Sequence, residues 1–293
     1  MNAATETPPV DDVAHARARP HWGRRAALAV GLLCALQLLW FLLTNPRFEW
    51  AVVAQYLTAA NVLKGLGVSV LLTAIGMTLG TVIGTGVALL KLSDFAPARA
   101  FGHFYTWLFR GTPVLIQLLA WYNLAYLLPE ITVSIPFGPT LLRWDTNELI
   151  TPFVAAVLGL ALNEAAYMAE IVRAGILSVD AGQRDAARAL GFTPARAFFR
   201  IVFPQAMRVV LPPAGSQVIG MLKGTSLVSV IAMTDLLFSV QTVYNRNFKV
   251  VPLLLVAVIW YLAVFTLLTL AQGRLERHFS RGHAAPAAIK GRP

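Results

Sequence analysis

Long apolar runs alternate with short polar segments over most of the chain. A helix needs about 20 apolar residues to cross the hydrocarbon core of a bilayer. Lys223 and several hydroxyl residues interrupt one run, and another is short. The pattern predicts an all-α integral membrane protein of about six transmembrane helices. We place these helices at residues 26–44, 65–90, 112–128, 150–170, 214–236 and 251–271.

The composition supports this class. Hydrophobic residues make up 57% of the chain and charged residues 13%, whereas soluble domains carry about 25% charged residues. The net charge is +10, but the basic residues are dispersed beside the apolar runs, so we expect no nucleic acid as a partner. Cys34 stands alone in an apolar run, which excludes a disulfide framework and a cysteine-based metal site.

The basic residues also predict an orientation. Most of the 24 Lys and Arg residues lie on the side of the predicted spans that carries both chain ends. The positive-inside rule places that side in the cytoplasm. The first apolar run follows a basic tail without a small-residue cleavage site, so we interpret it as a retained anchor. The polar segment before it is predicted to be disordered.

Small and polar residues mark particular faces of the spans. Gly76, Gly80 and Gly84 follow one another at four-residue spacing and share a helix face. Small residues on one face let another helix approach closely. We expect packing within the chain, with a subunit interface as the alternative.

Several polar side chains lie at depth in the predicted spans, and such groups usually face protein or a water-filled cavity. We consider them candidate pathway or gate residues: Gln117, Tyr122, Asn123, Asn163 and Lys223. A lysine at the predicted depth of Lys223 is costly without water or a partner, so it either lines the path near the inner gate or extends to the cytoplasmic interface. At the inner end of the fourth span, Glu164, Glu170 and Arg173 are expected to stabilise the root of the following loop.

Two loops are long enough to matter for function. The outer segment 129–149 is rich in proline and acidic residues, and it is either a docking surface or an ordinary ordered loop. The inner segment 174–213 predicts two short helices. Asp180 can cap the first helix, and Gly191 suits its left-handed end. Thr193 before a proline starts the second helix, which runs to about residue 202. Prolines 204, 212 and 213 then fix the exit of the loop.

The inner loop contains Asp-Ala-Ala at 185–187, then Gly191, and Ile-Val-Phe-Pro at 201–204. This pattern, in which nine residues separate Gly191 from Ile201, resembles the EAA loop of permeases of ATP-binding-cassette (ABC) importers, with Asp185 in place of glutamate and Phe203 in place of leucine. Further segments over residues 63–275 are similar to the polar amino-acid branch of this family: FRGTPVLIQ, NEAAYMAEIVRAGILSV, GQRDAARALG, FPQAMRVVLPP and LKGTSLVS.

The resemblance implies a type I importer permease fold in a bacterial inner membrane. The implied residues that dock the loop into a separate ATPase are Asp185, Ala186, Ala187, Gly191, Ile201 and Pro204. It also implies as partners an ABC ATPase in two copies, a second permease (identical or a sister chain) and an external solute-binding protein. The chain has no GxxxxGK phosphate loop, so ATP hydrolysis is expected in another polypeptide, with no catalytic, cofactor or metal site here.

Four segments are therefore expected along the chain. They are a cytoplasmic tail (1–25), an additional first helix with an outer connector (26–62), the permease core (63–275) and a second cytoplasmic tail (276–293). An ion- or proton-coupled secondary transporter is the alternative function, but such proteins often show duplicated halves, and no repeat of that kind is present. A membrane scaffold without transport would leave the polar residues in several spans unexplained.

Overall fold

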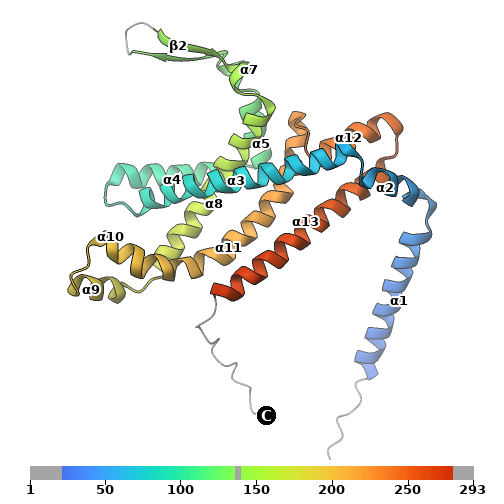
Figure 1. Cartoon of the computed structure of the whole chain (residues 1–293), viewed down its shortest axis with the longest axis horizontal. Helices are drawn as coiled ribbons and strands as arrows, with labels where there is room; N and C mark the ends of the chain where they lie inside the picture. The colour runs from blue at the N-terminus through green and yellow to red at the C-terminus, as the bar shows by residue number, and fades with distance from the viewer. Residues whose placement is uncertain (1–21, 136–139, 280–293) are drawn as a thin grey trace, which may run out of the picture. The chain divides into compact units, whose positions relative to one another are not determined.

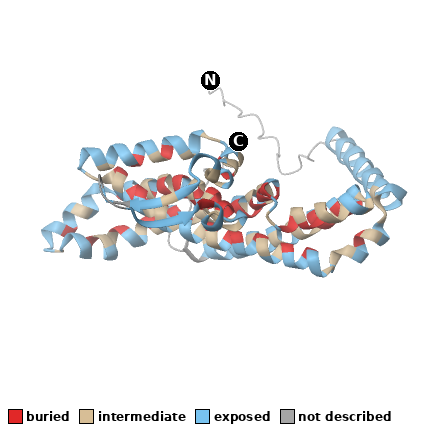
Figure 2. Cartoon of the chain, turned by 90° about the horizontal axis from the view of Figure 1, so that it is seen from above, coloured by how far each residue is buried: buried red, intermediate tan, exposed pale blue. Residues whose placement is uncertain are grey.

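The computed structural model describes residues 22–135 and 140–279, and the chain divides into two units, Met1–Phe48 and Glu49–Pro293. In the first unit, α1 (Trp22–Thr44) precedes a 3-10 turn, Pro46–Phe48. None of the residues of α1 is buried (Figure 2), and the helix is apolar on every side. Because α1 already begins at Trp22, only the first 21 residues of the predicted tail remain, and they lie outside the described residues, as do residues 280–293 of the second tail.

The second unit consists of long helices joined by short connectors (Figure 1). Its elements are, in chain order, α2 (Trp50–Leu57), α3 (Ala60–Leu92), α4 (Ala96–Gly111), α5 (Val114–Tyr122), α6 (Leu124–Leu127), β1 (Glu130–Ser134), β2 (Thr140–Asp145), α7 (Thr146–Leu149), α8 (Pro152–Leu177), α9 (Ala181–Ala189), α10 (Pro194–Ala197), a π-helical turn (Phe198–Val202), α11 (Phe203–Gly224), a 3-10 segment (Thr225–Ile231), α12 (Leu236–Asn247) and α13 (Val250–Phe279).

The packing of α3 against α8 forms the centre of this unit. A Cβ atom at Gly80 would lie 2.8 Å from the Cβ of Glu164, and one at Gly84 would lie 2.6 Å from the carbonyl oxygen of Ala165. Only glycine allows the two backbones to come this close. The expectation that the glycine face serves packing within the chain is therefore confirmed.

Two apolar clusters hold the remaining helices. One joins α3, α5, α8 and α11 around Leu72, Leu118 and Leu160. The other joins α2, α3, α12 and α13 around Leu236 and Leu253. Buried positions lie on the faces where these helices meet (Figure 2), while the outward faces remain exposed and apolar. A helix surface of this kind is suited to lipid rather than water.

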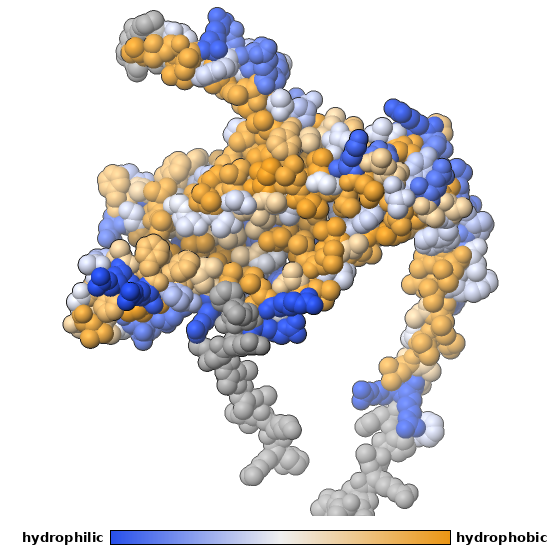
Figure 3. All heavy atoms as spheres, in the orientation of Figure 1, coloured by the Kyte–Doolittle hydropathy of each residue, from blue (hydrophilic) through white to orange (hydrophobic). Residues whose placement is uncertain are grey.

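Four helices of the described residues are long and apolar enough to cross a membrane, namely α1, α3, α8 and α13. A bent pair, Pro194–Ile231 with Leu236–Asn247, makes a fifth candidate. Apolar side chains cover most of the visible face of the second unit (Figure 3), and hydrophilic ones gather around α9 and at the C-terminal end of α13. The helical membrane fold is confirmed, and the predicted number of about six spans is compatible with it.

Two predicted spans differ in detail. Residues 112–128 do not form one helix, because α5 ends at Tyr122 and is capped by Asn123. The side-chain amide of Asn123 donates a hydrogen bond to the carbonyl of Leu119. The span predicted at 214–236 begins earlier, at Phe203, and Pro212 and Pro213 lie inside α11 instead of ending the inner loop. Proline is tolerated within membrane helices because neighbouring groups satisfy the freed backbone atoms.

The outer loop contains a two-stranded antiparallel hairpin, β1 with β2, that sequence patterning did not predict. Ile131 lies opposite Trp144, and Val133 lies opposite Leu142. Directly opposite residues share a face, so these four form an apolar face of the hairpin. The hairpin projects away from the helices next to α7 (Figure 1). Its tip, residues 136–139, lies outside the described residues.

Candidate functional site

The inner loop forms a helix, a sharp corner and a second helical start. The Asp180 carboxylate accepts a hydrogen bond from the backbone N–H of Gly182, 2.8 Å away, and caps α9. Gly191 follows α9 with φ of 74°, a conformation that glycine adopts without the steric cost of a Cβ. The Thr193 hydroxyl then accepts from the backbone N–H of Arg196 at the start of α10. The corner predicted at Gly191 is present.

The second predicted helix continues further than expected. After α10, a π-helical turn leads directly into α11, so the backbone remains helical from Pro194 through Gly224. Pro204 directly follows the π-helical turn inside this continuous helix, and so it does not mark a helix start. The half-buried Ile201 lies in the π-helical turn. The loop is thus one short helix joined at a corner to the extended end of a membrane helix.

The side chains of α9 separate into an inner and an outer set. Ala187 is 1% exposed and packs inside the loop. Arg184 donates from Nη2 to the carbonyl of Ile176, 2.7 Å away, and so fastens α9 to the last turn of α8. On the opposite side, Asp185 and Ala186 are exposed, and the Asp185 carboxylate lies 3.8 Å from Nη1 of Arg188 on the same helix.

The exposed side of the loop also carries large apolar groups. Leu190 is 75% exposed and Phe199 is 66% exposed. Beneath them, Val179, Val202 and Ala206 form a small buried cluster of the loop's own. The loop therefore has a packed base, and its exposed residues include aliphatic, aromatic and charged groups.

The predicted pathway residues do not form one site. Gln117 and Asn163 come together: Nδ2 of Asn163 lies 3.4 Å from Oε1 of Gln117, and both side chains donate to the backbone carbonyl of Phe109. Tyr122 and Asn123 instead line a separate shallow pocket beside α7. Lys223 is exposed and places its ammonium group 5.7 Å from the centre of the Phe265 ring on α13.

A small cavity of about 170 Å³ opens between α5, α8 and α11. Asn163 lines it together with Glu164, Tyr167 and Gln217. Glu164 is 6% exposed, and its Oε1 has no hydrogen-bond partner among the described residues. Sequence reasoning assigned Glu164 to the loop root. Its neighbour Asn163 was the available signal, since adjacent polar residues within a span point to a cavity.

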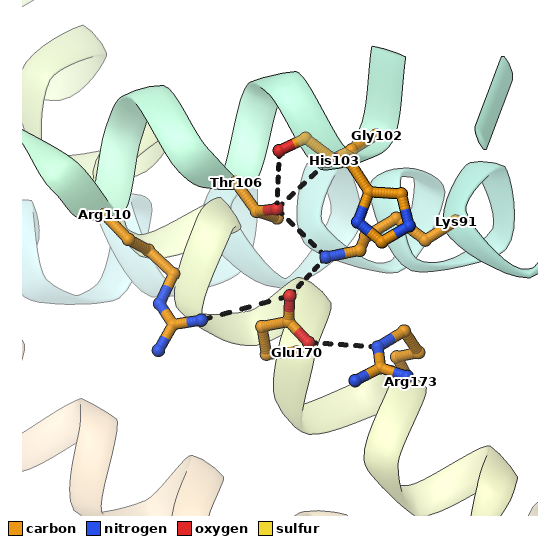
Figure 4. Close-up of polar contacts among 7 residues, drawn as sticks. All are labelled: Lys91, Gly102, His103, Thr106, Arg110, Glu170 and Arg173. Atoms are coloured by element: carbon orange, nitrogen blue, oxygen red, sulfur yellow. Dashed lines mark hydrogen bonds and ion pairs between the residues drawn. The ribbon is translucent and has the colours of Figure 1, made fainter. Parts of the chain in front are cut away.

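A second group of charges was predicted only in part (Figure 4). Lys91 of α3 is 7% exposed and pairs with Glu170 of α8, and its ammonium group also donates to the hydroxyl of Thr106, 2.9 Å away. Arg173 donates from Nε to the other oxygen of Glu170 at 3.0 Å. The sequence predicted the Glu170–Arg173 pair on one helix face, but Lys91 was counted only as a flanking basic residue.

Residues 76–281 match the family described as "Binding-protein-dependent transport system inner membrane component". The chain belongs to this family. The match includes most of the second unit and the whole inner loop, and the family resemblance read from the loop motif is confirmed. The expected localisation in the inner membrane is likewise stated by the family description.

Individual relatives of this chain are permeases of transport systems, in agreement with the family description. The arginine transport system permease protein ArgU of Corynebacterium glutamicum is 38% identical over 89% of this chain and 82% of its own length. The L-cystine transport system permease protein TcyB of Bacillus subtilis is 33% identical over 74% of this chain and 86% of its own length. These permeases are transport subunits, so the chain is a permease subunit and not an enzyme.

Solved structures give the same fold. A crystal structure of an amino acid ABC transporter with histidines superposes with a TM-score of 0.62 at 34% identity, over 74% of this chain and 94% of that chain. The methionine transporter MetNI in an inward-facing form has a TM-score of 0.58 at 19% identity, over 75% of this chain and 96% of that chain. The chain is therefore the permease subunit of an ABC importer.

Proposed function

We propose that this permease carries a polar amino acid or a similar small solute, delivered by an external binding protein, and that its inner loop couples it to a separate ATPase. The names of the relatives, which refer to arginine and cystine, support the substrate class. The observation that carries the coupling role is the α9–Gly191–α10 corner with its exposed outer face. A secondary transporter would have no use for such a loop.

The chemistry of the loop suits docking into a groove of another protein. Exposed Leu190 follows the charged Asp185 and Arg188 closely along the chain, and exposed Phe199 adds an aromatic group to the loop. A short helix with apolar anchors and flanking charges is a common form of helix-in-groove recognition. Ala186 presents a small side chain that lets the partner approach closely, whereas buried Ala187 preserves the shape of the loop.

Movement of the loop would reach the spans through two connections. Arg184 ties α9 to the end of α8, and the continuous helix after Thr193 makes α10 part of α11. When two ATPases close on ATP, the docked loops move as rigid bodies and bias the path between inward and outward access. Gly191 lies between these two connections, at the corner of the loop.

The solute path is proposed to pass the cavity between α5, α8 and α11. Asn163, Glu164 and Gln217 supply amide and carboxylate groups there, which are suited to the ammonium and carboxylate ends of an amino acid. Gln117 supports this wall through Asn163. Tyr122 and Asn123 are proposed to contact the solute at a separate pocket, and Lys223 is proposed to act at the inner gate.

Pairing and orientation complete the proposal. A second permease, identical or a sister chain, forms the other half of the path, and two ATPase copies serve the pair. Both termini lie in the cytoplasm, because the segments rich in Lys and Arg then face inward.

The test is reconstitution in vesicles with an ABC ATPase and a solute-binding protein that copurify with this permease. We expect uptake of a labelled amino acid that requires both partners and ATP, with cationic amino acids and cystine tried first. An ATPase variant unable to hydrolyse ATP is the matched control. Uptake driven by an ion or proton gradient without the ATPase would establish the secondary transporter instead.

A further inference from the structure

Glu170 receives three cations from three helices (Figure 4). Lys91 of α3 and Arg110 of α4 approach the same oxygen, Oε1, and Arg173 of α8 bonds Oε2. One carboxylate therefore joins α3, α4 and α8 near the inner ends of these helices. The three cations differ in their distance from the carboxylate and in their exposure.

The Lys91–Glu170 contact is the fixed part of this group. The Lys91 side chain is 3% exposed, and its ammonium group has a second bond to Thr106 of α4. Removing Glu170 would leave a buried ammonium group without a counter-charge, which is strongly destabilising. This contact must persist whenever the protein is folded.

Arg110 is held much more loosely. Its Nη1 lies 3.9 Å from Oε1 of Glu170, and its side chain is 46% exposed. In the same position, its guanidinium group lies 5.3 Å from the centre of the Tyr167 ring, which is a second weak contact between α4 and α8. A half-exposed ion pair at this distance contributes little, so Arg110 can leave Glu170 at small cost while Lys91 stays.

Arg110 and Glu170 lie near both the cavity wall and the inner loop. Arg110 follows Phe109, whose carbonyl accepts the hydrogen bonds of Gln117 and Asn163 at the cavity wall. Glu170 lies on α8 about two turns before the carbonyl of Ile176 that anchors the inner loop. The Arg110–Glu170 pair therefore lies between the inner loop, which the ATPase is proposed to move, and the residues that line the proposed solute path.

We propose that Arg110 is a positioning residue that acts as a releasable latch: it strengthens the attachment of the α4–α5 corner to α8 at rest, beside the Asn163–Phe109 hydrogen bond, and separates from Glu170 when the loop moves, while Lys91–Glu170 remains closed. The proposal rests on the proposed coupling to an ATPase. A latch of this kind keeps the importer idle until the loaded binding protein arrives.

The experiment compares Arg110→Gln with Arg99→Gln in the full complex reconstituted in vesicles. Arg99 lies on the same helix, is exposed and contacts only the carbonyl of Ser93 among the described residues, so both variants lose one charge from α4. We expect Arg110→Gln to raise ATP hydrolysis in the absence of binding protein about two- to fivefold, as the release of a weak ion pair allows. Arg99→Gln should match the wild type, and Arg110→Lys should restore most of the dependence on binding protein.

The possible outcomes distinguish the latch proposal from the proposed function. Equal basal hydrolysis in Arg110→Gln and the wild type, with coupled uptake in both, overturns the latch and leaves the proposed function intact. A wild-type complex whose uptake ignores ATP overturns the proposed function itself. Equal thermal midpoints of the two glutamine variants establish that the change in hydrolysis does not come from a damaged fold.

Discussion

The side-chain amide of Asn163 donates a 2.8 Å hydrogen bond to the backbone carbonyl of Phe109, joining α8 to the last turn of α4. Gln117 donates to the same carbonyl at 2.9 Å and to the carbonyl and hydroxyl of Thr112. Two residues selected as pathway candidates therefore also hold the corner between α4 and α5. A wall residue that is fixed in this way presents its remaining polar atoms to a solute in one orientation.

The shared acceptor predicts how two substitutions combine. In Asn163→Leu or Gln117→Leu, the Phe109 carbonyl keeps one donor, whereas in the double variant it loses both. We expect each single change to cost about 1 kcal/mol, and the double change to exceed the sum by at least about 0.5 kcal/mol. Thermal unfolding in detergent measures the three values. Asn123→Leu, which removes a bond within α5 only, serves as the control. Strict additivity would contradict the shared role of the carbonyl.

The close approach of α3 and α8 predicts a steric effect at Gly80. Gly80→Ala would place a Cβ 2.8 Å from the Cβ and Cγ atoms of Glu164, so the helices must separate. Overpacking of this kind costs about 1–3 kcal/mol. Gly86→Ala, on the same helix with nothing within 4 Å of the added atom, should be neutral or slightly stabilising. The yield of monodisperse protein and its thermal midpoint compare the two, and equal behaviour would refute the packing argument.

Local chemistry made some features predictable. The caps at Asp180 and Thr193 and the corner at Gly191 depend on residues within a few positions of each other, so the sequence specifies them directly. The glycine spacing on α3 predicted a close helix contact for the same reason, although it did not name α8 as the partner.

Features that depend on distant partners were not predictable in this way. Lys91 and Glu170 are 79 positions apart, and nothing local to either one indicates the other. Pro212 and Pro213 were expected to fix the exit of the inner loop, but both lie inside α11, where neighbouring groups in a membrane helix can make proline tolerable. The hairpin lies within the outer segment 129–149, which was interpreted only as a loop because it is rich in proline and acidic residues, so no strand pairing was expected there.

The conformation of Gly191 predicts a test that separates backbone strain from contact. No atom lies within 4 Å of a Cβ added at Gly191, so a substitution acts only through its φ of 74°. Gly191→Val should cost about 1–2 kcal/mol locally and distort the corner while the protein still inserts. Gly191→Asn, which accepts this conformation more readily, should behave like the wild type. Copurification with the ATPase and vesicle uptake are the measurements; normal coupling in the valine variant would remove the corner from the mechanism.

The proposed gate role of Lys223 predicts a loss of transport without a loss of stability. Its ammonium group lies over the Phe265 ring, a contact worth about 0.5–1 kcal/mol at an exposed site. Lys223→Met should therefore change the free energy of unfolding by no more than about 1 kcal/mol, while uptake falls because the charge at the gate is gone. Phe265→Leu removes the ring and keeps the charge, so it should retain uptake. Lys223 faces α13 and not the cavity of Glu164. Normal transport by Lys223→Met would therefore show that this lysine contributes only a surface contact.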